Sequence, residues 1–165
     1  DDNMPNTFKL FRFLDYINIK MPNLKHSYFC EVLKWVPVDR SFTGKYSMTC
    51  EDYNQKYYSP YCCGIANLIT IDMIPKLFNS SFFVPSFWVD DMYVGFVTNM
   101  LKVKMIDISQ SIFYFPKDLN TKNEKFLKNF LIARDVYESK DIKFIWNIIM
   151  KQQFNYTNHF FDLFN

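Results

Sequence analysis

The sequence predicts a mixed α/β fold in a single domain. Segments with apolar residues at helical spacing alternate with short apolar runs that are typical of strands, which is the pattern of α/β proteins. The length of 165 residues suits one domain, and 49% hydrophobic against 22% charged residues indicates a folded core. With 19 phenylalanines, 11 tyrosines and only 3 glycines, that core is expected to be built largely from aromatic rings.

The first predicted helix covers residues 6–18. Asn6 or Thr7 can cap its N-terminus, because a side-chain oxygen at that position accepts a hydrogen bond from a backbone N–H of the first turn. Four apolar residues recur at helical spacing and are expected to share one face: Leu10, Phe11, Leu14 and Ile17.

Two strands and a second helix are predicted next. Residues 26–33 and 66–71 are typical of strands, whereas turn signals and many tyrosines make 34–60 an irregular surface segment. A helix is expected over 72–78, with Asp72 as its N-cap.

The C-terminal part is predicted to contain three helices and a strand. Residues 91–101 show helical spacing and 103–108 are typical of a strand. Two further helices are expected over 122–133 and 141–151, followed by an irregular aromatic tail, 154–165. The helix over 141–151 is expected to bury Phe144, Ile145, Ile148 and Ile149.

Charge and hydropathy narrow the classes of partner. The net charge of +2 and the scattered basic residues give no footprint for nucleic acid, so none is expected as a partner. No apolar stretch approaches the roughly 18 residues that span a bilayer. The chain opens on "DDNMPN", without an initiator Met or a signal peptide, which suggests a piece of a longer protein.

The four cysteines leave two interpretations open. Cys62 and Cys63 are neighbours and are not expected to bond each other, while Cys30 and Cys50 stand apart. In a secretory setting two disulfides are possible, with no way to choose the pairing, and in a reducing one all four would be buried thiols. Two glycosylation sequons, at Asn79 and Asn155, favour the secretory setting.

Four ordered segments carry a family resemblance. "YYSPYCCGIANLITIDMIPKL" (57–77) is similar to the signature "YPPYCSGxGYVLS", and "DDMYVG" (90–95) to "EDVYVG". Upstream, "RSFTGKYSMTCEDYNQKYY" (40–58) is similar to "RxxxSKWYVSxEEYPxxxYP", and the opening "DDNMPNTFKLFRFL" (1–14) to "DDDVFVNLxxLLxFL". The chain thus resembles the inverting β1,3-glycosyltransferases, which include β1,3-galactosyltransferases and β1,3-N-acetylglucosaminyltransferases, with fringe enzymes as more distant relatives.

The resemblance implies a fold, a chemistry and a location. The fold would be GT-A, a Rossmann-like α/β domain, of which residues 1–165 would be the C-terminal portion. The reaction would be hexosyl transfer from a UDP-sugar donor to a glycan acceptor with a divalent metal, Mn²⁺ or Mg²⁺. The parent protein would be a type II Golgi membrane protein, reaching the membrane only through an anchor outside this chain.

The resemblance also assigns two pairs of acids. Asp2 matches the family's metal ligand and Asp1 the preceding acid of the same triplet, although by themselves they would be a charged terminus. Asp91 matches the proposed general base and Asp90 the acid before it. Either could instead cap a helix, and a helix N-terminus would fix a carboxylate while lowering its pKa.

Five residues are predicted to bind substrate. Tyr58, Pro60, Tyr61 and Gly64 match residues that shape the floor of the family's site, and Trp88 precedes the acids. Aromatic faces can stack on a sugar and glycine permits close backbone approach, although for the aromatic residues ordinary packing is the alternative.

The sequence departs from the family at several positions. Cys63, Ile65 and Asn67 replace a serine, a small residue and an aromatic, which would reshape the pocket. The downstream histidine ligand of many GT-A enzymes has no counterpart in 92–158, because the only histidines are His26 and His159. An inactive relative that binds glycans or supports a partner transferase is therefore the alternative to an enzyme. A family-blind interpretation is an aromatic-rich binding module such as a lectin.

Overall fold

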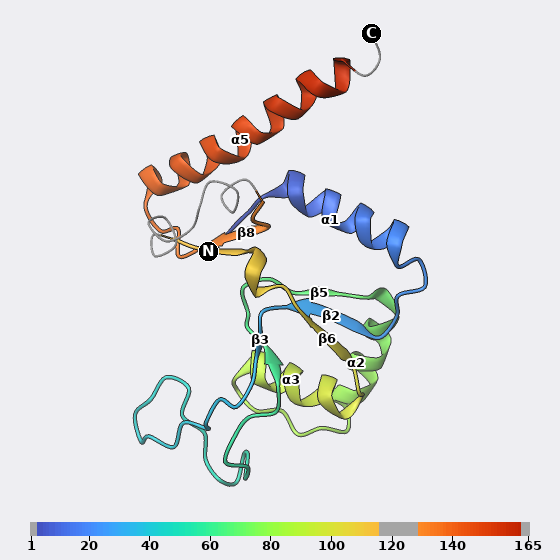
Figure 1. The fold of residues 1–165 in the computed structure, drawn as a ribbon. Helices are drawn as coiled ribbons and strands as arrows, with labels where there is room; N and C mark the ends of the chain where they lie inside the picture. Colours follow the sequence, from blue (N-terminus) through green and yellow to red (C-terminus); the bar gives the residue numbers. More distant parts are fainter. Residues whose placement is uncertain (1–2, 116–128, 163–165) are drawn as a thin grey trace. The chain divides into compact units, whose positions relative to one another are not determined.

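The structure is a computed structural model that describes residues 3–115 and 129–162, with their side chains as far as Lys151 (Figure 1). The chain divides into two compact units: a terminal unit, Asp1–Pro22 with Gln110–Asn165, and a central unit, Asn23–Ser109. Both contain helices and strands, which confirms the mixed α/β class.

The described part of the terminal unit contains a three-stranded sheet and two α-helices. Strand β8 (Ile132–Arg134) lies between β1 (Met4–Pro5), which is antiparallel to it, and β7 (Ile112–Tyr114), which is parallel. Helix α1 (Thr7–Lys20) follows β1, and α5 (Ser139–Asp162) follows β8. The core of this unit combines residues of β7, β8 and α5 with the loops beside them: Phe113, Phe115, Phe130, Ala133, Val136, Ile145 and Ile149.

The predicted first helix is confirmed, but not all of its apolar face. The Lys9 backbone N–H donates to Asn6 Oδ1 over 3.2 Å, and Asn6 is fully buried, so Asn6 is the N-cap. Phe11, by contrast, is 67% exposed. It is offset by about 100° around the helix from its neighbour Leu10, which is half-buried, and so it falls outside the buried stripe.

Three expectations for the C-terminal region need correction. The helix predicted over 122–133 is wrong at its end, because Ala133 pairs with both Met4 and Phe113 in the sheet; residues 122–128 lie outside those described. In α5, Ile145 and Ile149 are buried as predicted, whereas Phe144 is 41% exposed. The tail from Phe154 to Asp162 is helical rather than irregular, since no glycine or proline interrupts α5 there.

The central unit is built on a three-stranded sheet in the order β5-β2-β6. Strand β2 (Ser27–Cys30) lies in the middle and all four of its residues are buried. Strand β5 (Leu68–Ile69) is antiparallel to β2 and β6 (Lys104–Asp107) is parallel to it. A parallel neighbour requires a long crossover, and here the chain between β2 and β6 contains the helices and loops of the site. The strands predicted in 26–33, 66–71 and 103–108 are therefore confirmed, although all three are shorter than predicted and the first segment is divided between β2 and a second short strand over Val32–Leu33.

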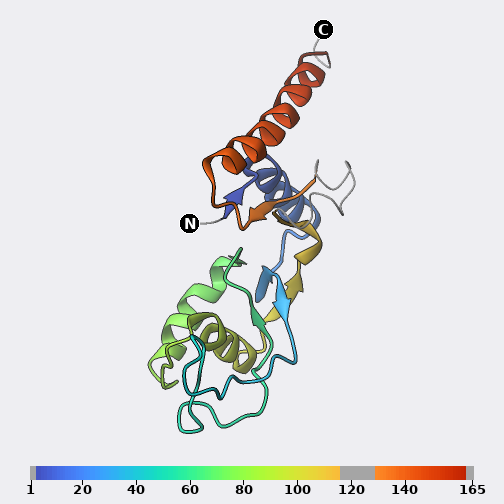
Figure 2. The ribbon, with the colours of Figure 1, turned by 90° about the vertical axis from the view of Figure 1, so that its left-hand side faces the viewer.

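Two helices of the central unit lie on one side of this sheet (Figures 1 and 2). They are α2 (Ile74–Ser81), preceded by the 3₁₀ turn η1 (Ile71–Met73), and α3 (Asp90–Met100). The core between helices and sheet gathers Tyr28, Met73, Leu77 and Val94 with their neighbours.

The predicted helix cap at Asp72 is wrong. Helix α2 begins at Ile74, with Met73 as its N-cap residue and no side-chain capping bond. The Asp72 carboxylate instead accepts the backbone N–H of His26 over 3.2 Å, so it anchors the entry to β2. An aspartate just before a helical pattern predicts a cap, but the sequence does not show that its carboxylate binds a backbone group far away in the chain.

A small hairpin-like pair connects the sheet to the site. Strand β3 (Val32–Leu33) pairs antiparallel with β4 (Tyr61–Cys62), and a disulfide joins Cys30 to Cys62 with their Cα atoms 5.5 Å apart, a usual span for this bond. The structure thus contains one disulfide, with Cys50 and Cys63 outside it, so neither the two disulfides nor the four buried thiols of the two interpretations are found in full. Residues 34–60, all of which the structure describes, contain only an isolated bridge and otherwise no helix or strand, as predicted.

Among the described residues, no helix combines the length and the apolar character needed to cross a bilayer.

Candidate active site

The first turn of α3 carries the two adjacent acids. Val89 is the extended N-cap residue, so Asp90 and Asp91 are the first two helical residues, and the expectation that one of them is the N-cap is wrong. The Asp90 carboxylate accepts the backbone N–H of Asp91 over 2.9 Å. This bond fixes Asp90 across the start of the helix and leaves the Asp91 side chain to contact another segment.

Asp91 is held by the glycine of the "YCCG" segment. The backbone N–H of Gly64 donates to Asp91 Oδ2 over 2.9 Å, although 27 residues separate the two in sequence. A Cβ atom on Gly64 would lie 2.8 and 2.9 Å from the two carboxylate oxygens of Asp91. Only a glycine leaves room for the carboxylate at this distance. The "YCCG" and "DDMYVG" segments therefore build one site together.

A second glycine lets the helix that carries Asp91 lie directly on strand β4. Gly95 is buried in the middle of α3, and a Cβ there would lie 2.8 Å from Tyr61 Cα and 3.1 Å from the carbonyl oxygen of Pro60. These neighbours are backbone atoms, which cannot rotate away. The absence of a side chain at Gly95 therefore sets how closely Asp91 approaches the "YCCG" segment.

The surroundings of Asp91 favour its protonated form. Burial raises the pKa of Asp91, the negative charge of Asp90 raises it further, and the Gly64 hydrogen bond only partly opposes them. The lowering expected from the helix N-terminus is therefore wrong in direction. Burial, with a contribution from Asp91, also raises the pKa of Tyr28 and of Tyr61 to about 12.

Asp90, Asp91 and Tyr61 line a cleft of about 630 Å³. Five of the residues predicted to act in the site line it: Tyr58, Tyr61, Trp88, Asp90 and Asp91. Its volume and its mixture of aromatic and charged side chains suit a ligand of the size of one or two sugar rings.

One wall of the cleft is a stacked aromatic pair. The rings of Trp88 and Tyr46 are nearly parallel, at 5°, with their centroids 6.2 Å apart, and the Trp88 indole N–H donates to the Ser47 carbonyl over 3.0 Å. The ammonium group of Lys45 lies 5.0 Å from the centre of the Tyr46 ring. Trp88 is 55% exposed, so this wall presents an apolar face to solvent. Such a face can stack on a sugar ring.

The irregular segment beside the cleft is organised by Arg40. Its guanidinium donates to the carbonyl oxygens of Met48 at 2.7 Å, Thr49 at 2.5 Å and Gln55 at 3.1 Å, and also to that of Tyr53. Four carbonyls on one side chain hold a segment that has almost no strand or helix pairing of its own. Arginine has the planar set of donors that this requires.

The Tyr58 hydroxyl is a further polar group in the cleft wall. It is buried and makes no hydrogen bond within the described part of the chain. Burial raises its pKa, which the charge of Arg40 partly offsets. A buried hydroxyl without a protein partner is costly unless a ligand or water satisfies it.

Some predicted site residues lie elsewhere. Pro60 lines a neighbouring pocket rather than the cleft, and Asp1 and Asp2 lie outside the described residues. Within residues 3–115 and 129–151, no three His, Cys, Asp or Glu side chains gather to hold a metal ion. His26 contacts Asp72 and Lys76 instead, and the side chain of His159 is also outside the described set.

Nine of the fourteen residues that line the cleft were not predicted, and three of these are charged or aromatic. Tyr46, Lys45 and Asp39 all line it, and all belong to the irregular segment, in which sequence periodicity gives no orientation. The signal that could have found two of them is the upstream motif, because Lys45 and Tyr46 match its Lys-Trp pair.

Comparison with known proteins identifies the family of this chain. A sequence model described as Galactosyltransferase matches residues 1–109, which include Asp91, Gly64 and the whole cleft. The UDP-GalNAc:beta-1,3-N-acetylgalactosaminyltransferase 1 proteins of Homo sapiens and Sus scrofa are 25% identical to the chain over 121 residues, and that of Rattus norvegicus is 26% identical. The alignment covers 73% of this chain but 35% of each relative, so the chain spans about a third of their length. The chain belongs to the galactosyltransferase family.

Proposed function

We propose that this chain forms the acceptor side of the active site of a UDP-sugar-dependent β1,3-hexosyltransferase that extends glycans on proteins or lipids with inversion. The observation that carries the proposal is the Asp91 carboxylate, which lines a sugar-sized cleft, is fixed by the Gly64 N–H over 2.9 Å, and has a raised pKa. Family membership supplies the reaction class, and the geometry supplies a residue for its proton transfer.

In the proposed step, Asp91 acts as the general base. The acceptor hydroxyl gives its proton to the Asp91 carboxylate while its oxygen bonds to C1 of the donor sugar, and the bond from C1 to the UDP oxygen breaks on the opposite face. The electron pair of that bond leaves with UDP, so the configuration at C1 inverts. The raised pKa makes the Asp91 carboxylate a stronger base than that of an ordinary exposed aspartate.

The remaining cleft residues would position substrates. The stacked Trp88 and Tyr46 rings offer a flat apolar wall for the acceptor sugar, and the buried Tyr58 hydroxyl is available to bond a sugar hydroxyl. Asp90, held across the helix start, acts as a positioning residue that also raises the pKa of Asp91. The relatives are named for UDP-GalNAc, so UDP-GalNAc is the first donor to assay.

We also propose that Mn²⁺ or Mg²⁺ is bound by Asp2, with Asp1 beside it. The resemblance of the opening residues to the family's acidic triplet supports this. Carboxylate oxygens suit both cations, and a bound cation would neutralise charge on the departing diphosphate. Manganese binding, followed by its electron paramagnetic resonance signal, should weaken in Asp2→Asn and be unchanged in Asp15→Asn, a variant of an exposed acid on α1.

A GT-A fold for the whole catalytic domain, and a Golgi type II protein facing the lumen, complete the proposal. The Cys30–Cys62 disulfide supports it, since disulfides persist in the oxidising secretory pathway. Localisation of the tagged full-length protein by microscopy, with protease protection of the catalytic domain in sealed vesicles, tests this part.

The decisive experiment is sugar transfer by the full-length protein with Asp91→Asn. Removing the base should lower kcat by about 10²–10⁴-fold with little change in the binding of acceptor. Asp15→Asn should transfer at the wild-type rate. Unchanged turnover in Asp91→Asn would exclude it as the base. Glycan binding without turnover in the wild type would favour the inactive relative instead.

A further inference from the structure

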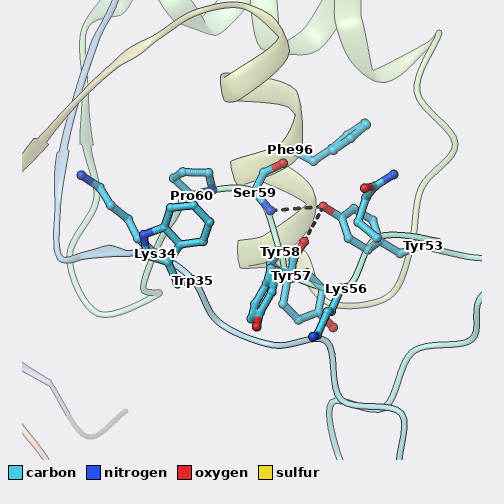
Figure 3. Close-up of a pocket in the computed structure, with 10 residues that line it drawn as sticks. Lys34, Trp35, Tyr53, Lys56, Tyr57, Tyr58, Ser59, Pro60 and Phe96 are labelled. Carbon is cyan, nitrogen blue, oxygen red and sulfur yellow. Dashed lines mark hydrogen bonds between the residues drawn. The ribbon is translucent and has the colours of Figure 1, made fainter.

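The central unit contains a second pocket, of about 550 Å³, that shares Tyr58 with the cleft of Asp91 (Figure 3). Seven of its ten lining residues lie in the motif segments 40–58 and 57–77, but the proposed catalysis gives a role to Tyr58 alone among them. Because one buried tyrosine borders both spaces, a ligand longer than a single sugar can be expected to contact both.

Two paired backbone segments build the mouth of this pocket. The Tyr58 N–H donates to the Val36 carbonyl over 2.9 Å, next to the bridge between Pro37 and Tyr57. This pairing places the ring of Trp35 against that of Tyr57, edge to face, with centroids 6.3 Å apart and an interplanar angle of 83°. The two aromatic rings thus form a corner and not a stack.

Trp35 is held in an unusual conformation. Its φ is 59°, a left-handed backbone that bulky residues seldom adopt, and its side chain is 80% exposed. Burial of the tryptophan does not account for this conformation, since most of the ring faces solvent. Backbone conformations of this kind concentrate at ligand sites.

The floor of the pocket is rigid. The Tyr53 hydroxyl accepts the Ser59 N–H over 3.1 Å and donates to the Tyr57 carbonyl over 3.4 Å, and both bonds are drawn in Figure 3. The buried Tyr53 ring packs edge-on against Phe96, with centroids 6.0 Å apart. A fixed floor with an exposed aromatic mouth lowers the entropic cost of binding.

Two lysines give the pocket its charge. Lys34 and Lys56 line it, and none of the other described residues that line it carries a carboxylate. The Lys56 ammonium lies 5.5 Å from the centre of the Tyr57 ring, which holds it at the mouth. The pocket therefore combines aromatic faces with two ammonium groups, of which that of Lys34 also interacts with the carboxylate of Asp107, a residue outside the lining.

We propose that this pocket is an acceptor subsite for an anionic sugar, a pyranose carrying a carboxylate or a sulfate, in a glycan whose reacting end occupies the cleft. Perpendicular rings enclose a puckered sugar better than a planar base, which would prefer parallel faces. The lysines supply the partner for the acidic group. The link to catalysis rests on the proposed function, whereas the binding itself does not.

The test measures calorimetric Kd values of the full-length protein for three probes: lactose, 6′-sialyllactose and 6′-sulfated lactose. With two lysine contacts, the anionic probes should bind about tenfold more tightly than lactose at low salt. The preference should shrink as NaCl screens the charges. Tight binding of the sialylated probe alone assigns a carboxylate, and tight binding of both anionic probes assigns either acidic group.

Matched variants locate the binding. Trp35→Ala should abolish binding of the anionic probes, whereas Trp146→Ala, which removes another exposed tryptophan, should not. The double variant Lys34→Gln with Lys56→Gln should bind all three probes equally, while Lys104→Gln should keep the preference. Equal affinity for lactose and the anionic probes in the wild type, or unchanged binding in Trp35→Ala, would overturn the proposal. Displacement of the probes by free UDP would also overturn it, in favour of a nucleotide site.

An activity assay separates this subsite from the catalytic proposal. Trp35→Ala should raise KM for a sialylated acceptor and leave transfer to a monosaccharide acceptor unchanged, because a single sugar in the cleft does not reach Trp35. If the wild type transfers nothing, the catalytic proposal fails and the calorimetric result still decides the subsite.

Discussion

The three glycines of the chain offer a direct test of how the site is built. In Gly95→Ala the new methyl group would lie 2.8 Å from Tyr61 Cα and 3.1 Å from the Pro60 carbonyl oxygen. Favourable carbon contacts lie at about 3.5–4.0 Å, so helix α3 must move away from β4 by several tenths of an ångström or more.

The expected loss of folding stability in Gly95→Ala is the difference between two effects. Overpacking a well-packed interface costs about 1–3 kcal/mol, and replacing a helical glycine by alanine returns up to about 1 kcal/mol. Gly95→Ala should therefore destabilise the protein by about 1–2 kcal/mol. In a unit the size of the central one, this lowers Tm by roughly 5–15 °C, which thermal unfolding followed by circular dichroism resolves.

The other two glycines are matched controls with different outcomes. In Gly44→Ala the methyl group meets the side-chain ends of Asp39 and Ser41 in a surface loop, which can rotate away, so stability should change by at most about 0.5 kcal/mol. In Gly64→Ala it meets only the Asp91 carboxylate. That side chain can also move, so stability should stay near that of Gly44→Ala.

Activity should rank the glycines differently from stability. Gly64→Ala displaces the proposed base and disrupts its 2.9 Å hydrogen bond, and misplacement by about 1 Å can cost about 10²-fold in kcat/KM. Gly44→Ala displaces the side chain of the cleft residue Asp39 but leaves Gly64 and Asp91 in place, so it should lower kcat/KM less than Gly64→Ala does. A Gly95→Ala protein with wild-type Tm would refute the close approach of α3 to β4, and a Gly64→Ala protein with wild-type kcat/KM would refute the role of Gly64 in holding Asp91.

Three further predictions concern ionisation and buried hydroxyls. Asp90→Asn removes a negative charge that raises the pKa of Asp91, so the acid limb of kcat/KM against pH should move to lower pH. Asp91→Asn should raise Tm at neutral pH, because the pKa of Asp91 is higher in the folded than in the unfolded protein, so ionisation of Asp91 destabilises the fold. This gain in Tm should vanish below about pH 3, where Asp91 is protonated in both states. In urea unfolding, Tyr53→Phe should lower the free energy of unfolding by about 1 kcal/mol, because two hydrogen bonds are lost. Tyr58→Phe should be neutral or stabilising, because the Tyr58 hydroxyl has no partner in the described part of the chain. The reverse order of stability would contradict the hydrogen bonding described.

Local sequence determined the elements whose signals are local. The helix over Thr7–Lys20 has a cap and a periodic face close together in sequence, and the structure confirms both the helix and its Asn6 cap. The ordered motifs likewise gave the family, because residue identity at fixed spacing does not depend on knowing the fold.

Elements that depend on distant partners were the ones that sequence could not decide. The residues around Ala133 have a helical pattern but form a central strand, because the strands that contain Met4 and Phe113 pair with it on both sides. Asp72 has the sequence of a helix cap but binds the N–H of His26, 46 residues away along the chain.

The site itself shows the same division. Sequence alone selected the candidate site residues, namely the acids of "DDMYVG" and the glycine of "YCCG". Only the tertiary structure decided that Gly64 donates to Asp91, that Gly95 permits the approach, and that burial beside Asp90 raises the pKa of Asp91 instead of lowering it. Hydrogen bonding, close packing and desolvation act between segments brought together by folding, and their sign is set by distances that a linear spacing does not contain.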